Sequence, residues 1–133
     1  MTERKIVYAL NRIKSCKEQG FFLEALIKSY HLNVDLIKFM LSSVVPKYSA
    51  KDKKIKVIVQ EFLKEIETNA KLKAILNKKN LKAVKPWLDN MDAFFKALKL
   101  QYPANVNHLQ SDTEKVFALL NISANKLFVK NKN

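Results

Sequence analysis

Residues 21–43 constrain the fold more than any other segment, because apolar side chains recur along two sides of the helix that they predict. One stripe holds Leu23, Leu26, Tyr30, Val34, Ile37 and Leu41, and a second holds Ala25, Leu32, Leu36, Phe39 and Met40. Spacings of three and four residues place side chains on one helix face. A helix that is apolar on two sides usually packs against several neighbours. At about 1.5 Å per residue this central helix would be ~34 Å long, and it should end before Pro46.

The composition extends this expectation to the whole chain. One glycine and three prolines among 133 residues are fewer turn residues than a sheet protein of this size needs. Apolar residues make up 48% of the chain, enough for one hydrophobic core, and the length is typical of one domain. We expect a single all-α domain over residues 1–133. Its connections are short, which favours a four- or five-helix up-and-down bundle with mostly antiparallel neighbours.

Capping residues predict where the earlier helices begin and end. One helix is expected over 3–18, ending at the only glycine, Gly20, whose freedom to adopt a left-handed backbone suits a helix end. Ser49 and Asp52 approximate a capping box that would start the next helix. Asn69 should restart a short helix after it.

The later helices are predicted from proline and from a second capping box. Pro86 fits the first turn of a helix. Residues 102–110 are expected to form a loop, and the pattern Ser111-Asp-Thr-Glu114 predicts that the last helix starts there. The final residues, 130–133, should fray.

Charge is the strongest indication of a partner. The chain has 25 Lys and Arg against 12 Asp and Glu, a net charge of +13, which favours anionic partners: RNA, DNA, acidic proteins or an anionic membrane surface. Only Arg4 and Arg12 are arginines, and because lysine acts as a point charge, contacts should be nonspecific. Two alternatives stay open: AT-rich coding favours Lys, Asn and Ile and explains such a surplus without function, and a run of lysines can be an ordinary solvated surface.

The lysines concentrate between residues 47 and 85. The predicted nucleic-acid contacts fall in two groups, one at the start of a helix and one around the loop that follows it: Lys51, Lys53, Lys54 and Lys56, then Lys78, Lys79 and Lys82. Among aromatic residues in this region, Tyr48 is the one placed to stack on a base.

Few residues suggest catalysis or a cofactor. One cysteine and two histidines cannot complete a four-ligand zinc site, and one glycine cannot build a phosphate-binding loop, so no metal and no cofactor are expected. Cys16 and His31 are interpreted as packing residues, His31 as half-buried with Asp35 within helical reach. No targeting signal or membrane-spanning stretch is recognisable, so we expect a soluble, cytoplasmic protein without a membrane partner.

The loop that holds His108 is a candidate anion-binding place. The expected loop lies against the start of the last helix, where free backbone N–H groups can bind an anion.

Two segments, in order along the chain, carry a family resemblance. The first runs from Ala9-Leu10 through Lys17-Glu18-Gln19-Gly20-Phe21-Phe22 to Glu24-Ala25-Leu26 and Ser29-Tyr30-His31. The second is Gln101-Tyr102-Pro103-Ala104, ahead of Ser111-Asp-Thr-Glu114. They resemble the first helical hairpin and the Arg-Tyr-Pro loop of HEPN domains (higher eukaryotes and prokaryotes nucleotide-binding), and the resemblance spans most of the chain.

The resemblance implies a helical bundle, often dimeric, and an RNase motif in which an arginine precedes a histidine near the last helix. Here His108 stands at the histidine position and Gln101 at the arginine position, beside Tyr102 and Pro103. A neutral glutamine cannot supply the fixed charge that stabilises a phosphoryl transition state. The resemblance therefore implies a non-catalytic, homodimeric protein that binds RNA or a nucleotide, in a toxin–antitoxin or defence module with a nucleotidyltransferase-type partner. The alternatives are a metal-independent RNase that uses His108 and a purely structural helical dimer.

Overall fold

The structure, a computed structural model, describes residues 1–76, 80–98 and 105–131, and over these residues every regular element is a helix. The elements are α1 (Glu3–Glu18), α2 (Phe22–Val44), α3 (Ile55–Thr68), α4 (Ala70–Ile75), the short 3-10 helix η1 (Asn80–Ala83), α5 (Val84–Leu98) and α6 (Val106–Asn131). The prediction of an all-α chain is confirmed. None of the helices within these ranges is long and apolar enough to cross a lipid bilayer.

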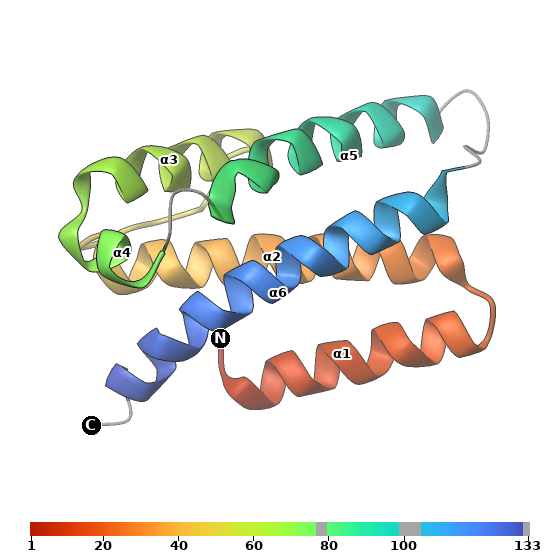
Figure 1. Ribbon diagram of the computed structural model, residues 1–133, viewed down its shortest axis with the longest axis horizontal. Coiled ribbons are helices and arrows are strands. Elements are labelled where there is room, and N and C mark those ends of the chain that lie inside the picture. The colour runs from red at the N-terminus through yellow and green to blue at the C-terminus, as the bar shows by residue number, and fades with distance from the viewer. Residues whose placement is uncertain (77–79, 99–104, 132–133) are drawn as a thin grey trace.

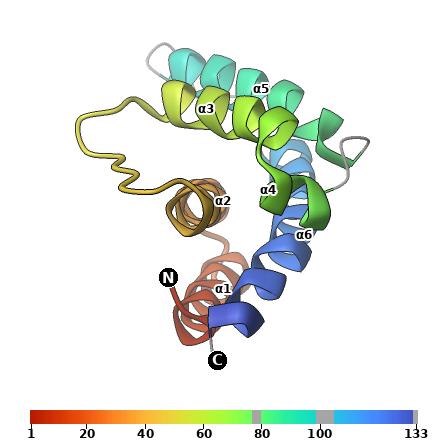
Figure 2. The same cartoon turned by 90° about the vertical axis from the view of Figure 1, so that its left-hand side faces the viewer.

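The two longest helices, α2 and α6, form the centre of the molecule and cross each other (Figure 1). Helix α1 covers one side of this pair, and α3 and α5 cover the other, one after the other along its length. Figure 2 shows the same layers end-on, with α2 between α1 and α3.

The helix directions differ from the predicted up-and-down arrangement. Helices α2, α3 and α6 run one way in Figure 1, whereas α1 and α5 run the opposite way. The reason is the connection over residues 45–54, which carries the chain back along the bundle before α3 begins. That connection is long enough to join two parallel helices, so α3 does not have to reverse direction relative to α2.

Helix α2 is the buried central helix that its two apolar stripes predict. Its side chains are buried around most of its circumference, and five of the larger ones are fully enclosed: Leu26, Leu36, Ile37, Met40 and Leu41. Burying one such side chain contributes roughly 1.5–3 kcal/mol. This helix is therefore the main source of hydrophobic stabilisation.

Three of the predicted helix ends are confirmed. Helix α1 covers Glu3–Glu18, and Gly20 after it has a φ of 79°, the left-handed region. The Asn69 side chain caps α4 by accepting hydrogen bonds from the backbone N–H groups of Lys71 and Leu72. Pro86 lies in the first turn of α5.

Both predicted capping boxes are wrong. Ser49 and Asp52 precede α3 without starting it: Asp52 has a φ of 61°, which a helix start does not allow, and α3 begins at Ile55. The region around Ser111 and Glu114 lies inside α6, which begins at Val106.

The early start of α6 has a physical cause. Val106, Leu109 and Thr113 are all buried, at helical spacing, so the buried face of this helix begins upstream of the predicted cap. Residues 106–110, predicted as part of a loop, are consequently helical. At the other end, Lys130 and Asn131 belong to α6, and residues 132–133 lie outside the described residues.

Candidate nucleic-acid interface

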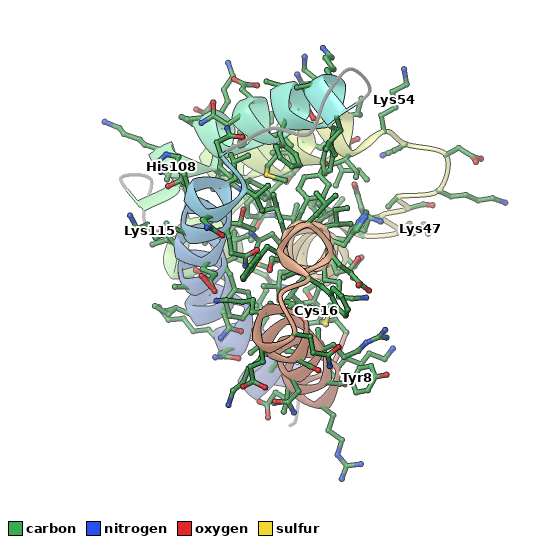
Figure 3. The ribbon with its side chains drawn as sticks, turned by 90° about the vertical axis from the view of Figure 1, so that its right-hand side faces the viewer. Tyr8, Cys16, Lys47, Lys54, His108 and Lys115 are labelled. Atoms are coloured by element: carbon green, nitrogen blue, oxygen red, sulfur yellow. The ribbon has the colours of Figure 1, made fainter. Side chains whose placement is uncertain are left out.

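The connection between α2 and α3 stands away from the bundle and carries the first group of predicted lysines. Figure 2 shows it projecting from one side of the molecule, and Figure 3 shows Lys47 and Lys54 on it. Lys47, Lys51 and Lys54, with Lys56 at the start of α3, are exposed. Within the described part of the chain none of these four forms an ion pair. We call these four residues the lysine loop.

Backbone turns hold the lysine loop in shape. Tyr48 donates its backbone N–H to the carbonyl of Val45 at 3.2 Å, and Lys53 donates to Ala50 at 3.2 Å. Lys47 is itself in the left-handed region, with a φ of 57°. A lysine there is uncommon, and its side chain is exposed.

Lys53, also predicted as a nucleic-acid contact, is occupied by other groups. Its Nζ lies 3.0 Å from Oε2 of Glu61 and 4.7 Å from the centre of the Tyr48 ring. Because the pair is partly exposed, it contributes at most about 1 kcal/mol. Lys53 can therefore bind a phosphate only if its ammonium group first leaves the Glu61 carboxylate.

Tyr48 does not have the exposed ring that base stacking needs. Its ring is half-buried and packs against the core, and its hydroxyl is buried without a hydrogen-bond partner. This burial, followed by the nearby Glu61 carboxylate, raises the pKa of Tyr48. The interpretation of Tyr48 as a stacking residue is wrong, because the ring anchors the lysine loop to the bundle.

Lys82, the one described member of the second group of predicted lysines, is not brought together with the first group. Lys82 is exposed on η1, and Figure 2 shows η1 on the side of the molecule opposite the 45–54 connection. Lys78 and Lys79 lie outside the described residues. Lys82 and the lysine loop are therefore on separate surfaces, although they are close in the sequence.

His108 lies on the opposite side of the molecule from the lysine loop (Figure 3). It is the third residue of α6, with a side chain that is 77% exposed, and its Nε2 lies 3.5 Å from Oδ2 of Asp112, one turn further on. The prediction that it sits in a loop is wrong. Its charged neighbour is a carboxylate, which is opposite to the fixed positive charge that the RNase motif requires. Gln101, Tyr102 and Pro103 of the family motif lie outside the described residues.

The other histidine belongs to a groove that sequence reasoning missed. His31 is exposed rather than half-buried, and its ring meets Tyr30 edge-on with a centroid distance of 5.4 Å. It lines a groove of about 300 Å³ with Tyr8 and Arg12 of α1 and Asp35 of α2. In the sequence, the one sign of this groove is that Tyr8 and Arg12 lie one helical turn apart on α1. They line the same groove as His31 only because α1 packs against α2.

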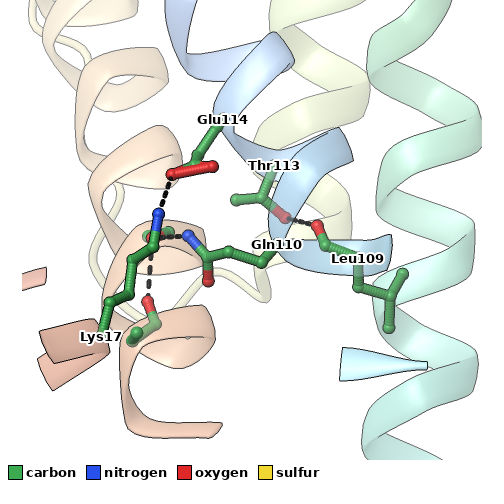
Figure 4. A network of polar contacts seen from close by, with 7 residues as sticks. Lys17, Leu109, Gln110, Thr113 and Glu114 are labelled. Carbon is green, nitrogen blue, oxygen red and sulfur yellow. Dashed lines mark hydrogen bonds and ion pairs between the residues drawn. The ribbon is translucent and has the colours of Figure 1, made fainter. Parts of the chain in front are cut away.

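Polar groups inside the bundle serve packing. Trp87 donates its indole N–H to Thr113 Oγ1 at 2.9 Å, and Asn33 donates its amide to the Thr113 carbonyl at 3.1 Å. Figure 4 shows a neighbouring set, in which Gln110 Nε2 donates to Ser29 Oγ at 2.9 Å and Lys17 pairs with Glu114 at 2.8 Å. These contacts join α2, α5 and α6 in the core and α1 to α6 at the surface.

Two further features of the surface are a second groove and the spacing of the side chains that could bind a metal ion. A groove of about 800 Å³ between α3, α4 and α6 is lined by Ile66, Glu67, Lys73, Ala74, Ile75, Leu76 and Lys126. Its walls are of mixed polarity, and its acid and two bases give it no strong charge. Over the described ranges, no three His, Cys, Asp or Glu side chains lie close enough to hold a metal ion.

Comparisons with protein-family models, with curated proteins and with solved structures found no match for this chain.

Proposed function

We propose that this chain is a non-catalytic, HEPN-like helical protein that binds RNA through the lysine loop. The observation that carries the proposal is the exposure of Lys47, Lys51 and Lys54 on a projecting connection and of Lys56 at the start of α3, none of them in an ion pair within the described residues. Lysines held in this way release the counterions of a nucleic acid when they bind it, which is the main source of nonspecific affinity.

The net charge supports an anionic partner. Of the 25 lysines and arginines behind the net charge of +13, the lysine loop brings four exposed lysines together on the α2–α3 connection and the first turn of α3. Lysine lacks the planar fork that reads bases and binds phosphate in two-point contacts. The proposed binding is therefore to the sugar–phosphate backbone and has little sequence preference.

The surroundings of His108 support a non-catalytic role. Metal-independent cleavage needs a positive group beside the imidazole to stabilise charge on the phosphate. Within the described residues, His108 is paired with the carboxylate of Asp112, and Arg12, the last arginine in the sequence, is on α1.

The test compares two variants with the same loss of charge. In the first, Lys47, Lys51, Lys54 and Lys56 are changed to Gln; in the second, Lys5, Lys96, Lys115 and Lys126, which are also exposed, are changed to Gln. We expect the first variant to lose most of its retention of single-stranded RNA at moderate salt and the second to lose much less. Equal losses would mean that net charge alone attracts the RNA and would contradict the assignment of the site.

A further inference from the structure

The groove between α1 and α2 has a composition that suits one nucleotide. Its volume is about 300 Å³; Tyr8, Arg12, Lys28, His31 and Asp35 form its polar part, and Ala9 and Leu32 its apolar part. An aromatic ring, a guanidinium and an apolar wall are the groups that bind an unpaired base together with its phosphate.

Tyr8 is the group that offers a stacking surface. Its side chain is 62% exposed, unlike the half-buried Tyr48. The Cζ atom of Arg12 lies over the ring at 5.6 Å from its centre, a cation–π contact that holds the ring in place on one face. The exposure of the side chain leaves ring surface available to a base.

Arg12 is the cation of the groove that is not neutralised. Lys28 lies 3.5 Å from the carboxylate of Glu24, whereas Arg12 forms no ion pair within the described part of the chain. A guanidinium that is exposed beside an aromatic ring can bind a phosphate while the ring holds the adjacent base.

The groove and the lysine loop share one side of the molecule. Figure 3 shows Tyr8 on the same side as Lys47 and Lys54, with His108 and Lys115 on the other. A strand that crosses the lysine loop can therefore continue to α1 without passing around the bundle.

We propose that this groove holds one unpaired nucleotide of a single-stranded RNA, with its base stacked on Tyr8 and a phosphate bound by Arg12. The inference rests on the proposed function, since the lysine loop supplies the rest of the affinity. It adds a preference for single strands: both faces of a base inside a duplex are covered by its neighbours, so the ring can stack only on an unpaired base.

The test uses affinities for a single-stranded and a double-stranded RNA of equal length. Tyr8→Ala should weaken single-strand binding by about 5- to 100-fold, the usual effect of losing one stacked base, and leave duplex binding unchanged. Tyr8→Phe keeps the ring and should bind as the parent does. The matched control is Phe21→Ala, which removes another exposed aromatic side chain, one that does not line the groove.

The guanidinium is tested with the other arginine as its control. Arg12→Gln should weaken single-strand binding more than Arg4→Gln does, although both remove one positive charge from α1. A strand with 2-aminopurine in place of an adenine supplies a direct readout of stacking. Its fluorescence should be quenched by the parent and by Tyr8→Phe, but not by Tyr8→Ala.

The outcomes separate this inference from the proposed function. If the lysine-loop variant loses RNA but Tyr8→Ala binds both RNAs like the parent, the inference fails and the proposed function stands. If the lysine-loop variant keeps its RNA, the proposed function fails. If sedimentation shows that the parent self-associates and that Tyr8→Ala separates the copies without changing RNA affinity, the groove is a protein interface and the inference is overturned.

Discussion

Trp87 of α5 donates its indole N–H to the hydroxyl of Thr113 of α6 at 2.9 Å, and both side chains are buried. The same hydroxyl lies 2.6 Å from the carbonyl of Leu109, one turn earlier in α6. Thr113 is thus a polar connection between helices in the core, at a position where the local sequence pattern predicts the exposed first turn of a helix.

Removing this hydroxyl should destabilise the fold. Thr113→Val keeps the shape of the side chain but leaves the Trp87 N–H buried without an acceptor, which costs about 1–3 kcal/mol. Urea unfolding should show this loss in the free energy of unfolding, and Thr113→Ser should recover part of it. Thr68→Val, at the exposed end of α3, is the matched control and should change the free energy by less than about 0.5 kcal/mol.

Two polar residues that the sequence presents as helix caps should differ in their effect on stability. Asn69→Ala removes the cap of α4 and should cost about 0.5–2 kcal/mol. Ser111 is exposed inside α6, so Ser111→Ala should be nearly neutral. A large loss on changing Ser111, measured by urea unfolding, would mean that α6 begins there after all.

Alkaline pH should destabilise the protein through Tyr30. Burial, followed by the nearby Asp92, raises the pKa of Tyr30 to about 12, whereas the pKa in the unfolded chain is about 10. Between these values the unfolded state loses its phenolic proton first. The stabilisation is therefore complete below about pH 10 and declines up to about pH 12, by at most about 1.4 kcal/mol per pH unit.

The measurement is urea unfolding at pH 9, 10, 11 and 12 for the parent and for Tyr30→Phe. Phenylalanine has no proton to lose, and the lysines titrate equally in both proteins. The difference between the two free energies should therefore change with pH only above about 10. A difference that is constant up to pH 12 would mean that Tyr30 ionises as easily in the folded protein as in the unfolded chain.

His108 should not cleave RNA. Its ion-pair partner is the carboxylate of Asp112, and a missing transition-state contact typically costs 10²–10³-fold in rate, that is, roughly 3–4 kcal/mol. Labelled single-stranded RNA incubated with the parent and a chelator should remain as intact as with His108→Ala. Robust cleavage by the parent alone would make the chain an RNase and His108 its catalytic residue.

Local sequence signals predicted the central part of the fold. The two apolar stripes of α2, the single glycine after α1 and the cap at Asn69 each act over one or two helical turns, and the structure has all three where they were expected. Periodicity and capping are local, so no knowledge of the chain's path was needed.

The start of α6 and the make-up of the site depend on tertiary structure. The capping pattern at Ser111 is locally acceptable, but burial of Val106 and Leu109 against the bundle extends the helix past it. Lys51 and Lys82 are close in the sequence and far apart in the molecule, because the chain passes through α3 and α4 between them. The groove at Tyr8 and His31 exists only once α1 packs on α2.

The salt dependence of RNA binding tests the central claim most directly. The logarithm of the binding constant should fall linearly with the logarithm of salt concentration, and each phosphate contact to a single strand contributes about 0.7 to the slope. Changing Lys47, Lys51, Lys54 and Lys56 to Gln should therefore reduce the slope by up to about 3, while the variant at Lys5, Lys96, Lys115 and Lys126 keeps nearly the parent's slope. An unchanged slope in the lysine-loop variant would contradict the account, because it would mean that these four lysines touch no phosphate.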